Sequence, residues 1–457
     1  MILPDPVRLF PVSSSISGRA RGAASLLAAA FLLSCAATPS GSILHTTPAA
    51  QEESLALRPG VTVERSLSPQ GRDEIPMPLE AGRYLRVAFE THLPYDLTVS
   101  LLDPRRQVVS ETAGSDGQLS LITPAGGAYR IAVGKSDAQA KVSSYRITIL
   151  DARQVQPGDE DRVSADKALC EAKLLETKEK YAEAIERAKA SLDVWSRLLD
   201  VKGQFEAQYE LGILYDRSGN QDEAVRWYEQ ALLAAQGTGD RRSAAKAEAS
   251  IGIALFVRAK DEARGHLEAA LPVLTELGDS FRQAEILYRL GIHDQDLGRF
   301  DEAQGFYRQA LQAAELGNSQ LVPYILNGLG TIALTRGETQ EALERYRRAQ
   351  DLAVEPDQRQ AQAAALAGLG TIDRRQGRPQ EALRNLNAAL EINRKIASPG
   401  DEGRTLTLLG TVYLDLGEIA KAREDFQEAI QVFRVARDNG WLARALGVLG
   451  NADLSVG

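Results

Sequence analysis

The chain has 457 residues, of which 44% are hydrophobic and 25% charged, with 62 acidic and 53 basic side chains and a net charge of −9. A chain of this length and composition is globular and divides into more than one folding unit. The acidic balance excludes the basic surface that a nucleic-acid partner requires. Four histidines and two cysteines leave little material for a metal centre, and we expect no cofactor.

An export signal is predicted over residues 1–34. Three arginines precede an apolar run at residues 23–33, which is too short to span a bilayer as a mature helix. The run ends Leu-Leu-Ser-Cys35, and this resembles the bacterial lipobox, in which the cysteine receives a diacylglycerol and becomes the mature N-terminus. The resemblance implies a lipoprotein anchored by its acyl chains, and Ala36 after the cysteine implies the outer membrane, facing the periplasm. The alternative is a plain signal peptide cleaved near Ala36, with Cys35 there by chance.

The lipidated cysteine is followed by a predicted tether and a small β domain. Residues 35–60 are rich in Ala, Thr, Pro and Ser without a sustained period, which is typical of a flexible segment. Residues 61–152 contain short alternating or β-branched runs between Gly, Pro, Asp and Ser clusters, which predict the seven or eight strands of a β-sandwich.

The last two runs of this domain, at 126–134 and 143–150, resemble the final hairpin of the bacterial pre-peptidase C-terminal domain. Such domains can bind carbohydrate. The aromatic residues of this segment mostly alternate as core residues do, which favours packing over binding. They are Tyr84, Phe89, Tyr95, Tyr129 and Tyr145.

Residues 153–162 hold a Pro-Gly pair and an acidic run, and we interpret them as a solvated linker at a domain boundary. The rest of the chain, 163–457, repeats with a period of 39 or 40 residues, marked by a glycine that follows Leu or Ile. A glycine inside a helix costs up to about 1 kcal/mol relative to alanine, so we expect each one to make room for a neighbouring helix. The marker glycines are Gly212, Gly252, Gly291, Gly330, Gly370, Gly410 and Gly450.

Apolar positions around each marker follow a helical period, and a turn glycine divides most repeats into two helices. Stacked helix hairpins of this kind form an α-solenoid. The pattern resembles tetratricopeptide repeats in their longer form and implies a right-handed superhelix of seven complete hairpins plus a final single helix. The predicted fold class is therefore multidomain, with a small all-β sandwich followed by an all-α solenoid.

In tetratricopeptide arrays the first helix of each hairpin lines a concave groove, where ligands usually lie. Counting from the marker glycines gives the inward positions of these helices. The alternative for each such residue is an ordinary packing or solvated side chain. The groove candidates are Tyr209, Asp216, Tyr288, Gln295, Asn327, Thr331, Thr371, Arg374 and Thr411.

No catalytic motif is present: the sequence has no Gly-rich phosphate loop, HExxH, GxSxG elbow or cysteine pair. We expect His266 and His293 to be surface or packing residues, and Cys170 to be a buried small hydrophobe. The sequence therefore predicts no catalytic or metal-binding residues, and a protein that is not an enzyme.

The predicted function is a non-catalytic scaffold, lipid-anchored outside the cytoplasm, that binds a protein or peptide and touches the membrane only through its N-terminal lipid. The order of lipobox, sandwich and 40-residue repeats also resembles the N-terminal half of bacterial proteins that end in a CHAT domain, a caspase-like cysteine peptidase fold. The alternative function is therefore the regulatory or sensor arm of such a peptidase, whose catalytic domain is absent from this chain. The apolar final helix either caps the stack or leads into further chain.

Overall fold

The computed structural model describes residues 43–45, 60–67, 71–91, 97–114, 116–135, 144–317 and 319–454. The predicted leader, Cys35 and Tyr95 lie outside the described residues. The chain divides into two compact units, and each is described by itself: an N-terminal unit that ends at Arg282 and a C-terminal unit that begins at Gln283. None of the helices in the described ranges combines the length and the apolar character that crossing a membrane requires.

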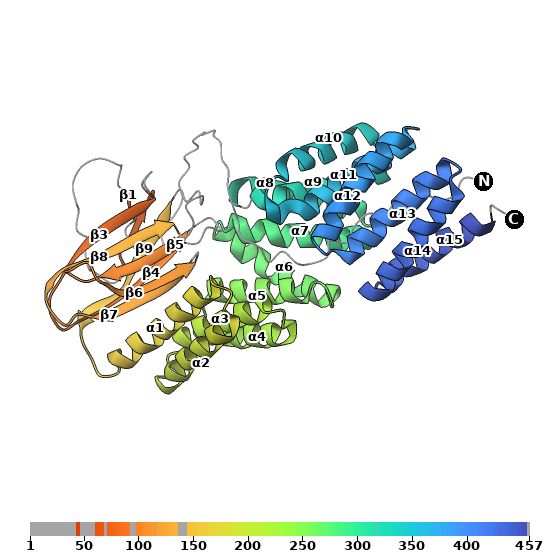
Figure 1. Ribbon diagram of the computed structural model, residues 1–457. Helices are drawn as coiled ribbons and strands as arrows, with labels where there is room; N and C mark the ends of the chain where they lie inside the picture. Colours follow the sequence, from red (N-terminus) through yellow and green to blue (C-terminus); the bar gives the residue numbers. More distant parts are fainter. Residues whose placement is uncertain are drawn as a thin grey trace. The chain divides into compact units, whose positions relative to one another are not determined.

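The N-terminal unit begins with the predicted β-sandwich, drawn in red to orange in Figure 1. Neighbouring strands run antiparallel except for the parallel pair β1 and β2. β1 lies within the segment 35–60, for which the composition predicts a tether. One sheet has the order β1 (Ile43–His45), β2 (Thr62–Arg65), β9 (Tyr145–Gln154), β4 (Arg83–Thr91) and β7 (Asp116–Ile122), and the other has the order β3 (Arg72–Leu79), β8 (Gly127–Lys135), β5 (Leu97–Leu102) and β6 (Val108–Gly114).

The sandwich core forms where the alternating pattern predicts it. Leu85, Val87 and Phe89 of β4 are buried in one cluster with apolar residues from both sheets. The other predicted aromatics within the described ranges, Tyr84, Tyr129 and Tyr145, are also at most 2% exposed. Their interpretation as packed side chains is confirmed.

The predicted closing hairpin of the sandwich is wrong. β8 pairs with β3 and β5, whereas β9 pairs with β2 and β4 in the other sheet. Tight hairpins use loops of two to five residues, and the segment between Lys135 and Tyr145 is longer. The alternation of two strands does not reveal which sheet each one joins, so a long connection leaves the pairing open.

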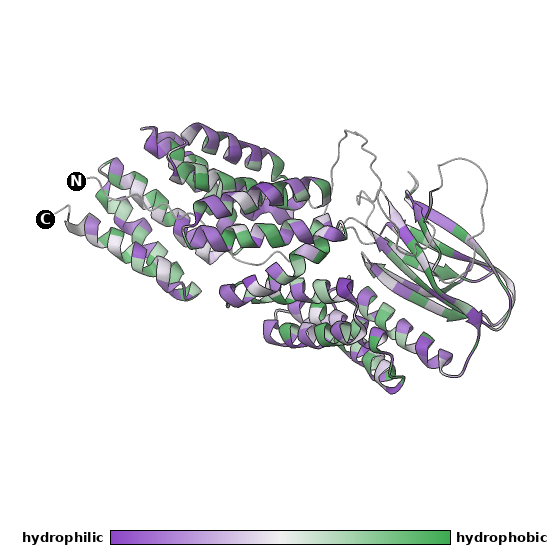
Figure 2. Ribbon diagram, turned by 180° about the vertical axis from the view of Figure 1, so that it is seen from behind, coloured by the Kyte–Doolittle hydropathy of each residue, from purple (hydrophilic) through white to green (hydrophobic). Residues whose placement is uncertain are grey.

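Helices occupy the chain from Asp159 onward and alternate as first and second helices of hairpins, followed by a single helix, α15 (Asn439–Leu454) (Figure 1). Polar and apolar residues share each helix, as expected where one face is buried (Figure 2). The N-terminal unit has α1 (Asp159–Glu176), α2 (Tyr181–Arg197), α3 (Val201–Arg217), α4 (Gln221–Thr238), α5 (Arg241–Leu255) and α6 (Lys260–Glu276), and the boundary between units lies in α7 (Ser280–Asp296). The C-terminal unit continues with α8 (Phe300–Gly317), α9 (Val322–Thr335), α10 (Thr339–Leu352), α11 (Arg359–Arg375), α12 (Pro379–Lys395), α13 (Pro399–Asp415) and α14 (Ile419–Ala436).

Six of the seven marker glycines sit where the two helices of a hairpin approach each other, and the seventh, Gly450, lies on the single helix α15. A Cβ built on Gly212 would lie 2.4 Å from the ring of Tyr228, and one on Gly410 would lie 2.6 Å from the ring of Phe426. A Cβ built on each of the four marker glycines between these two would lie 2.6 to 3.0 Å from a side chain of the partner helix. The predicted close approach is therefore confirmed in six hairpins. The four pairs are Gly252 with Leu267, Gly291 with Tyr307, Gly330 with Tyr346 and Gly370 with Leu386.

The linker between the sandwich and the helices ends earlier than the predicted range 153–162. α1 already begins at Asp159, and the acidic run supplies its first turn, where carboxylates are stabilised by the helix dipole. The Asp159 side chain is only 1% exposed and accepts hydrogen bonds from the guanidinium of Arg153 at 2.6 and 2.9 Å. The interpretation of this run as a solvated linker is therefore wrong for Asp159.

Candidate functional site

The first helices of successive hairpins form one face of each unit, here called the first-helix face. In the C-terminal unit this face is built by α7, α9, α11 and α13, and it contains a pocket of about 30 Å³. That volume holds about two water-sized groups, so the pocket admits the end of a side chain or a main-chain amide. Its polar lining residues are Tyr288 and Gln295 of α7, Tyr307 of α8, Tyr324, Asn327 and Thr331 of α9, Gln360 of α11 and Asp401 of α13.

Two polar atoms at this pocket have no hydrogen-bond partner among the described residues, the Tyr288 hydroxyl and Asn327 Oδ1. Tyr288 is 4% exposed and Asn327 is 7% exposed. The Nδ2 atom of Asn327 donates to the carbonyl oxygen of Ala361 at 2.8 Å, so the amide is fixed and Oδ1 is its unused end. An unpaired buried polar atom costs free energy. Both atoms therefore favour an incoming group that hydrogen-bonds to them.

Burial raises the pKa of the Tyr288 hydroxyl above its ordinary value, and the nearby hydroxyl of Tyr324 acts in the same direction. The phenol thus stays protonated and is able to donate or accept a hydrogen bond. Its ring packs against the rings of Tyr307 and Tyr324, with centroids 6.0 and 6.4 Å apart. These contacts hold the hydroxyl in a defined position at the pocket.

The other polar groups of the pocket already have hydrogen-bond partners. The hydroxyl of Tyr307 donates to Gln295 Oε1 at 3.1 Å. The carboxylate of Asp401 accepts from Arg404 at 2.7 Å and from Gln360 at 2.9 Å, so its charge is balanced. The pocket therefore offers a fixed neutral donor and acceptor, which complements a carboxamide or a peptide group.

The structure brings four of the nine groove candidates together at this pocket: Tyr288, Gln295, Asn327 and Thr331. The hydroxyl of Thr331 is itself used in packing, because it donates to the carbonyl oxygen of Asn327 at 2.9 Å and lies 3.0 Å from the Tyr346 hydroxyl. Its role at the pocket is to hold the wall in place.

Three further candidates of the C-terminal unit do not line the pocket. The hydroxyls of Thr371 and Thr411 donate to carbonyl oxygens one helical turn earlier, at 2.9 and 2.8 Å. Arg374 pairs with Asp415 at 3.0 Å. A threonine at an inward position often satisfies its hydroxyl within its own helix, which the spacing pattern alone does not reveal.

The remaining two candidates, Tyr209 and Asp216, belong to α3 in the N-terminal unit. The Tyr209 hydroxyl lies 2.9 Å from the hydroxyl of Ser250, and Asp216 accepts a hydrogen bond from Gln221 at 2.7 Å. They contribute to a different surface from the pocket.

Sequence reasoning missed four polar lining residues: Tyr307, Tyr324, Gln360 and Asp401. Tyr324 lies one helical turn before Asn327, so extending the inward stripe toward the start of the helix would have found it. Gln360 and Asp401 likewise lie in the first turns of their helices, ten and nine residues before the marker glycines Gly370 and Gly410. Tyr307 is on a second helix, which the inward stripe of the first helices does not include. Its ring reaches the pocket because it packs against Gly291 of the first helix.

Cys170, His266 and His293 are surface or packing residues, as the sequence predicts. Cys170 is buried, its thiol donates to the carbonyl oxygen of Gln118 at 3.2 Å, and burial raises the thiol pKa to about 12. His293 is 3% exposed, and His266 Nδ1 lies 2.5 Å from the carboxylate of Glu248. The described ranges contain no group of three or more His, Cys, Asp or Glu side chains able to hold a metal ion.

A family model described as tetratricopeptide repeat matches residues 165–236, 243–315 and 321–395, and a second model of the same description matches residues 367–443. Together the matches extend over more than half of the chain. A comparison with curated proteins gives no match.

Solved structures with similar helical arrays include the apo form of RapI, with a TM-score of 0.49 and 13% identity over 60% of this chain and 98% of RapI. The quorum sensor NprR from B. thuringiensis gives 0.46 and 12%, over 64% of this chain and 88% of NprR. BtubC from P. vanneervenii gives 0.39 and 21%, over 47% of this chain and 91% of BtubC. These likenesses concern the fold alone.

Proposed function

Because the chain belongs to the tetratricopeptide-repeat family, we propose that it is a non-catalytic scaffold that binds a protein or peptide segment on the first-helix face of its C-terminal unit. The observation that carries this proposal is the pair of unpartnered buried atoms at the pocket, the Tyr288 hydroxyl and Asn327 Oδ1. A carboxamide or peptide group would donate its N–H to Asn327 and accept from Tyr288.

The size of the pocket supports a peptide over a cofactor. Sites for drug-sized ligands have volumes of about 300 to 1,000 Å³, whereas this pocket has about 30 Å³. A single side chain or main-chain group fits it, and the rest of a peptide would lie along α9 and α11. We therefore favour a segment that places Asn, Gln or a main-chain amide in the pocket.

The experiment is a selection of displayed random peptides on the full chain, followed by measurement of Kd by fluorescence anisotropy. Tyr288→Phe removes one hydroxyl and keeps the ring. Because one neutral hydrogen bond is worth about 0.5–1.5 kcal/mol, we expect Kd to rise roughly 2- to 10-fold. Replacing the anchoring amide of the peptide by a methionine should remove the difference between the two proteins.

The matched control is Thr371→Val, which removes a buried hydroxyl that bonds within its own helix and does not line the pocket. Its Kd should equal that of the unchanged chain. Selected peptides that bind Tyr288→Phe as tightly as the unchanged chain would contradict this assignment of the site, and so would a selection that yields no binder.

We also propose that the chain is exported and held at the outer membrane through a lipid on Cys35. The support is the basic leader, its short apolar run and the lipobox-like end at residues 32–35. More than one acyl chain is needed for a stable anchor. We expect metabolic palmitate labelling of the unchanged chain, with loss of both label and membrane fractionation in Cys35→Ser.

Cys170→Ser is the control for this labelling, because Cys170 is the buried free cysteine. It should keep the label and the membrane fraction. An unlabelled, soluble chain that Cys35→Ser leaves unchanged would remove the lipoprotein proposal without affecting the peptide site.

A further inference from the structure

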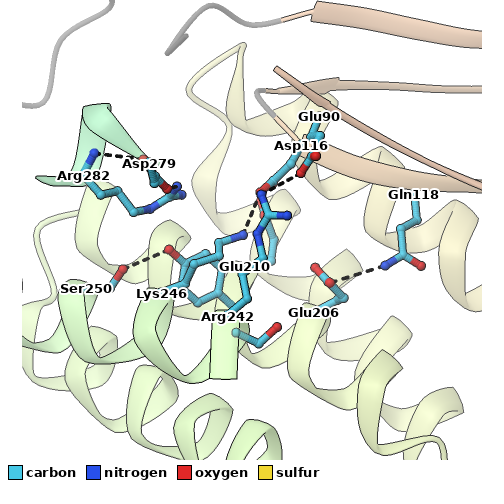
Figure 3. A network of polar contacts seen from close by, with 12 residues as sticks. Glu90, Asp116, Gln118, Glu206, Glu210, Arg242, Lys246, Ser250, Asp279 and Arg282 are labelled. Carbon is cyan, nitrogen blue, oxygen red and sulfur yellow. Dashed lines mark hydrogen bonds and ion pairs between the residues drawn. The ribbon is translucent and has the colours of Figure 1, made fainter. Parts of the chain in front are cut away.

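The start of β7 lies against the first-helix face of the N-terminal unit (Figure 3). Asp116, the first residue of β7, has its Oδ2 atom 2.7 Å from Nζ of Lys246 on α5. Its carbonyl oxygen accepts a hydrogen bond from Nζ of Lys173 on α1 at 3.0 Å. The sandwich thus places a carboxylate on the face that is built by α1, α3 and α5.

The ammonium group of Lys246 is held in place by the side chains around it. Its side chain is 12% exposed, and its Nζ lies 5.0 Å from the centre of the Tyr209 ring, a distance at which the ring face attracts a cation. The Tyr209 hydroxyl lies 2.9 Å from that of Ser250, which holds the ring in place. Partial burial opposes the charge of Asp116, but Lys246 and Lys173 lower its pKa below the ordinary value, so the carboxylate is ionised.

A second ion pair repeats this arrangement one helical turn away. Arg242 of α5 lies four residues before Lys246, and its Nη2 is 2.6 Å from Oε2 of Glu90 at the end of β4. Side chains four apart on a helix are neighbours on one face. Two adjacent cations of α5 are therefore each paired with a carboxylate of the sandwich.

The contacts of the sandwich with α5 differ from its contacts with α1. At α1 the interface is buried: Cys170 packs into the sandwich core, and Arg86 pairs with Asp166 at side-chain exposures of 11% and 3%. At α5 one member of each ion pair reaches solvent: Asp116 is 41% and Arg242 55% exposed, whereas their partners Lys246 and Glu90 are 12% and 25% exposed. Ion pairs that reach solvent are weaker than buried ones and are screened by salt, so an anion from solution competes with Asp116 and Glu90 more readily than with the buried pair at α1.

We propose that Lys246 and Arg242 of α5 form a binding site for an acidic peptide segment, which Asp116 and Glu90 of the sandwich occupy as an internal ligand. The partner is a protein segment with two carboxylates spaced to meet adjacent turns of α5. Binding of this partner displaces Asp116 and Glu90 from α5. Lys173 is left out of the site because its Nζ also lies 3.8 Å from the buried carboxylate of Glu210.

The test replaces both internal carboxylates by their neutral isosteres in the full chain, Asp116→Asn with Glu90→Gln, and measures binding of a fluorescent hexaglutamate peptide at low salt. We expect Kd to fall at least tenfold relative to the unchanged chain, and this gain to disappear when Lys246→Gln and Arg242→Gln are added. Hexaglutamine should bind neither protein. No gain in hexaglutamate affinity would overturn the proposal.

The charge control is Asp193→Asn with Glu186→Gln, which removes two carboxylates that are 79% and 76% exposed on α2 and leaves α5 unchanged. An equal gain in affinity with this variant would show a general charge effect and refute the site. If the Asp116 variant loses its fold, hydrogen exchange of residues 112–119 in the unchanged chain decides the question. Saturating hexaglutamate should speed that exchange, and unchanged exchange would contradict displacement.

Discussion

At the scale of single residues, six of the seven marker glycines are each matched to one large side chain of the partner helix. The matched side chain lies sixteen residues further on in five hairpins, as in Gly212 with Tyr228, and fifteen further on in the hairpin of Gly252 and Leu267. The shorter spacing belongs to the hairpin whose turn glycine is replaced by Ala259. A Cβ built on Gly450 would meet no side chain and no neighbouring helix within 4 Å among the described residues.

This pairing predicts opposite effects for the same substitution at two equivalent positions. In Gly410→Ala the new Cβ would lie 2.6 Å from the Phe426 ring, and overpacking costs about 1–3 kcal/mol, more than the gain in helix propensity of up to about 1 kcal/mol. In Gly450→Ala the new Cβ meets no neighbouring side chain among the described residues, so only the gain in helix propensity remains. Urea unfolding should show a lower midpoint for the first variant and an equal or higher one for the second. A shift of both in the same direction would contradict the packing role.

At the scale of secondary-structure elements, the helices could be predicted because their signal is local and repeated. Apolar spacing and the turn glycines specify a hairpin without reference to the rest of the fold, and Gly219 and Gly337 adopt the positive φ of 83° and 79° that these turns require. The strands could also be predicted one by one. Their pairing could not, because alternation gives the buried face of β8 and β9 but not the sheet that each joins.

The candidate site shows the same limit. Tyr288 and Asn327 follow from the inward stripe of the first helices, but the stripe does not separate side chains that are free to bind from those that bond within their helix, such as Thr371. Asp401 reaches the pocket from α13, two hairpins beyond α9, which carries Tyr324 and Asn327. Such contacts depend on how hairpins stack, which the period of 39 or 40 residues leaves unspecified.

At the scale of the whole molecule, the predicted boundary between sandwich and repeats separates them in sequence but not in packing. α1 completes the sandwich on one side, since Cys170 belongs to the sandwich core cluster, and it pairs with α2 on the other. Arg86 of β4 joins these layers: its guanidinium lies 3.0 Å from Asp166 of α1 and 4.8 Å from the centre of the Trp195 ring on α2. The sandwich and the first hairpin should therefore unfold together.

Arg86→Leu tests this cooperativity in the full chain. It leaves the Asp166 carboxylate buried without its guanidinium, and breaking a buried pair costs about 3–5 kcal/mol. Hydrogen exchange should speed up by a similar factor in β4, α1 and α2, with no change in α9 to α14 of the C-terminal unit.

Arg86→Leu with Asp166→Leu should recover part of the protection, because no buried charge then remains. Arg197→Ala, which breaks an ion pair with Asp193 whose side chains are 65% and 79% exposed, should leave exchange unchanged. Faster exchange in β4 alone, with α1 and α2 still protected, would show instead that the sandwich unfolds independently of the repeats.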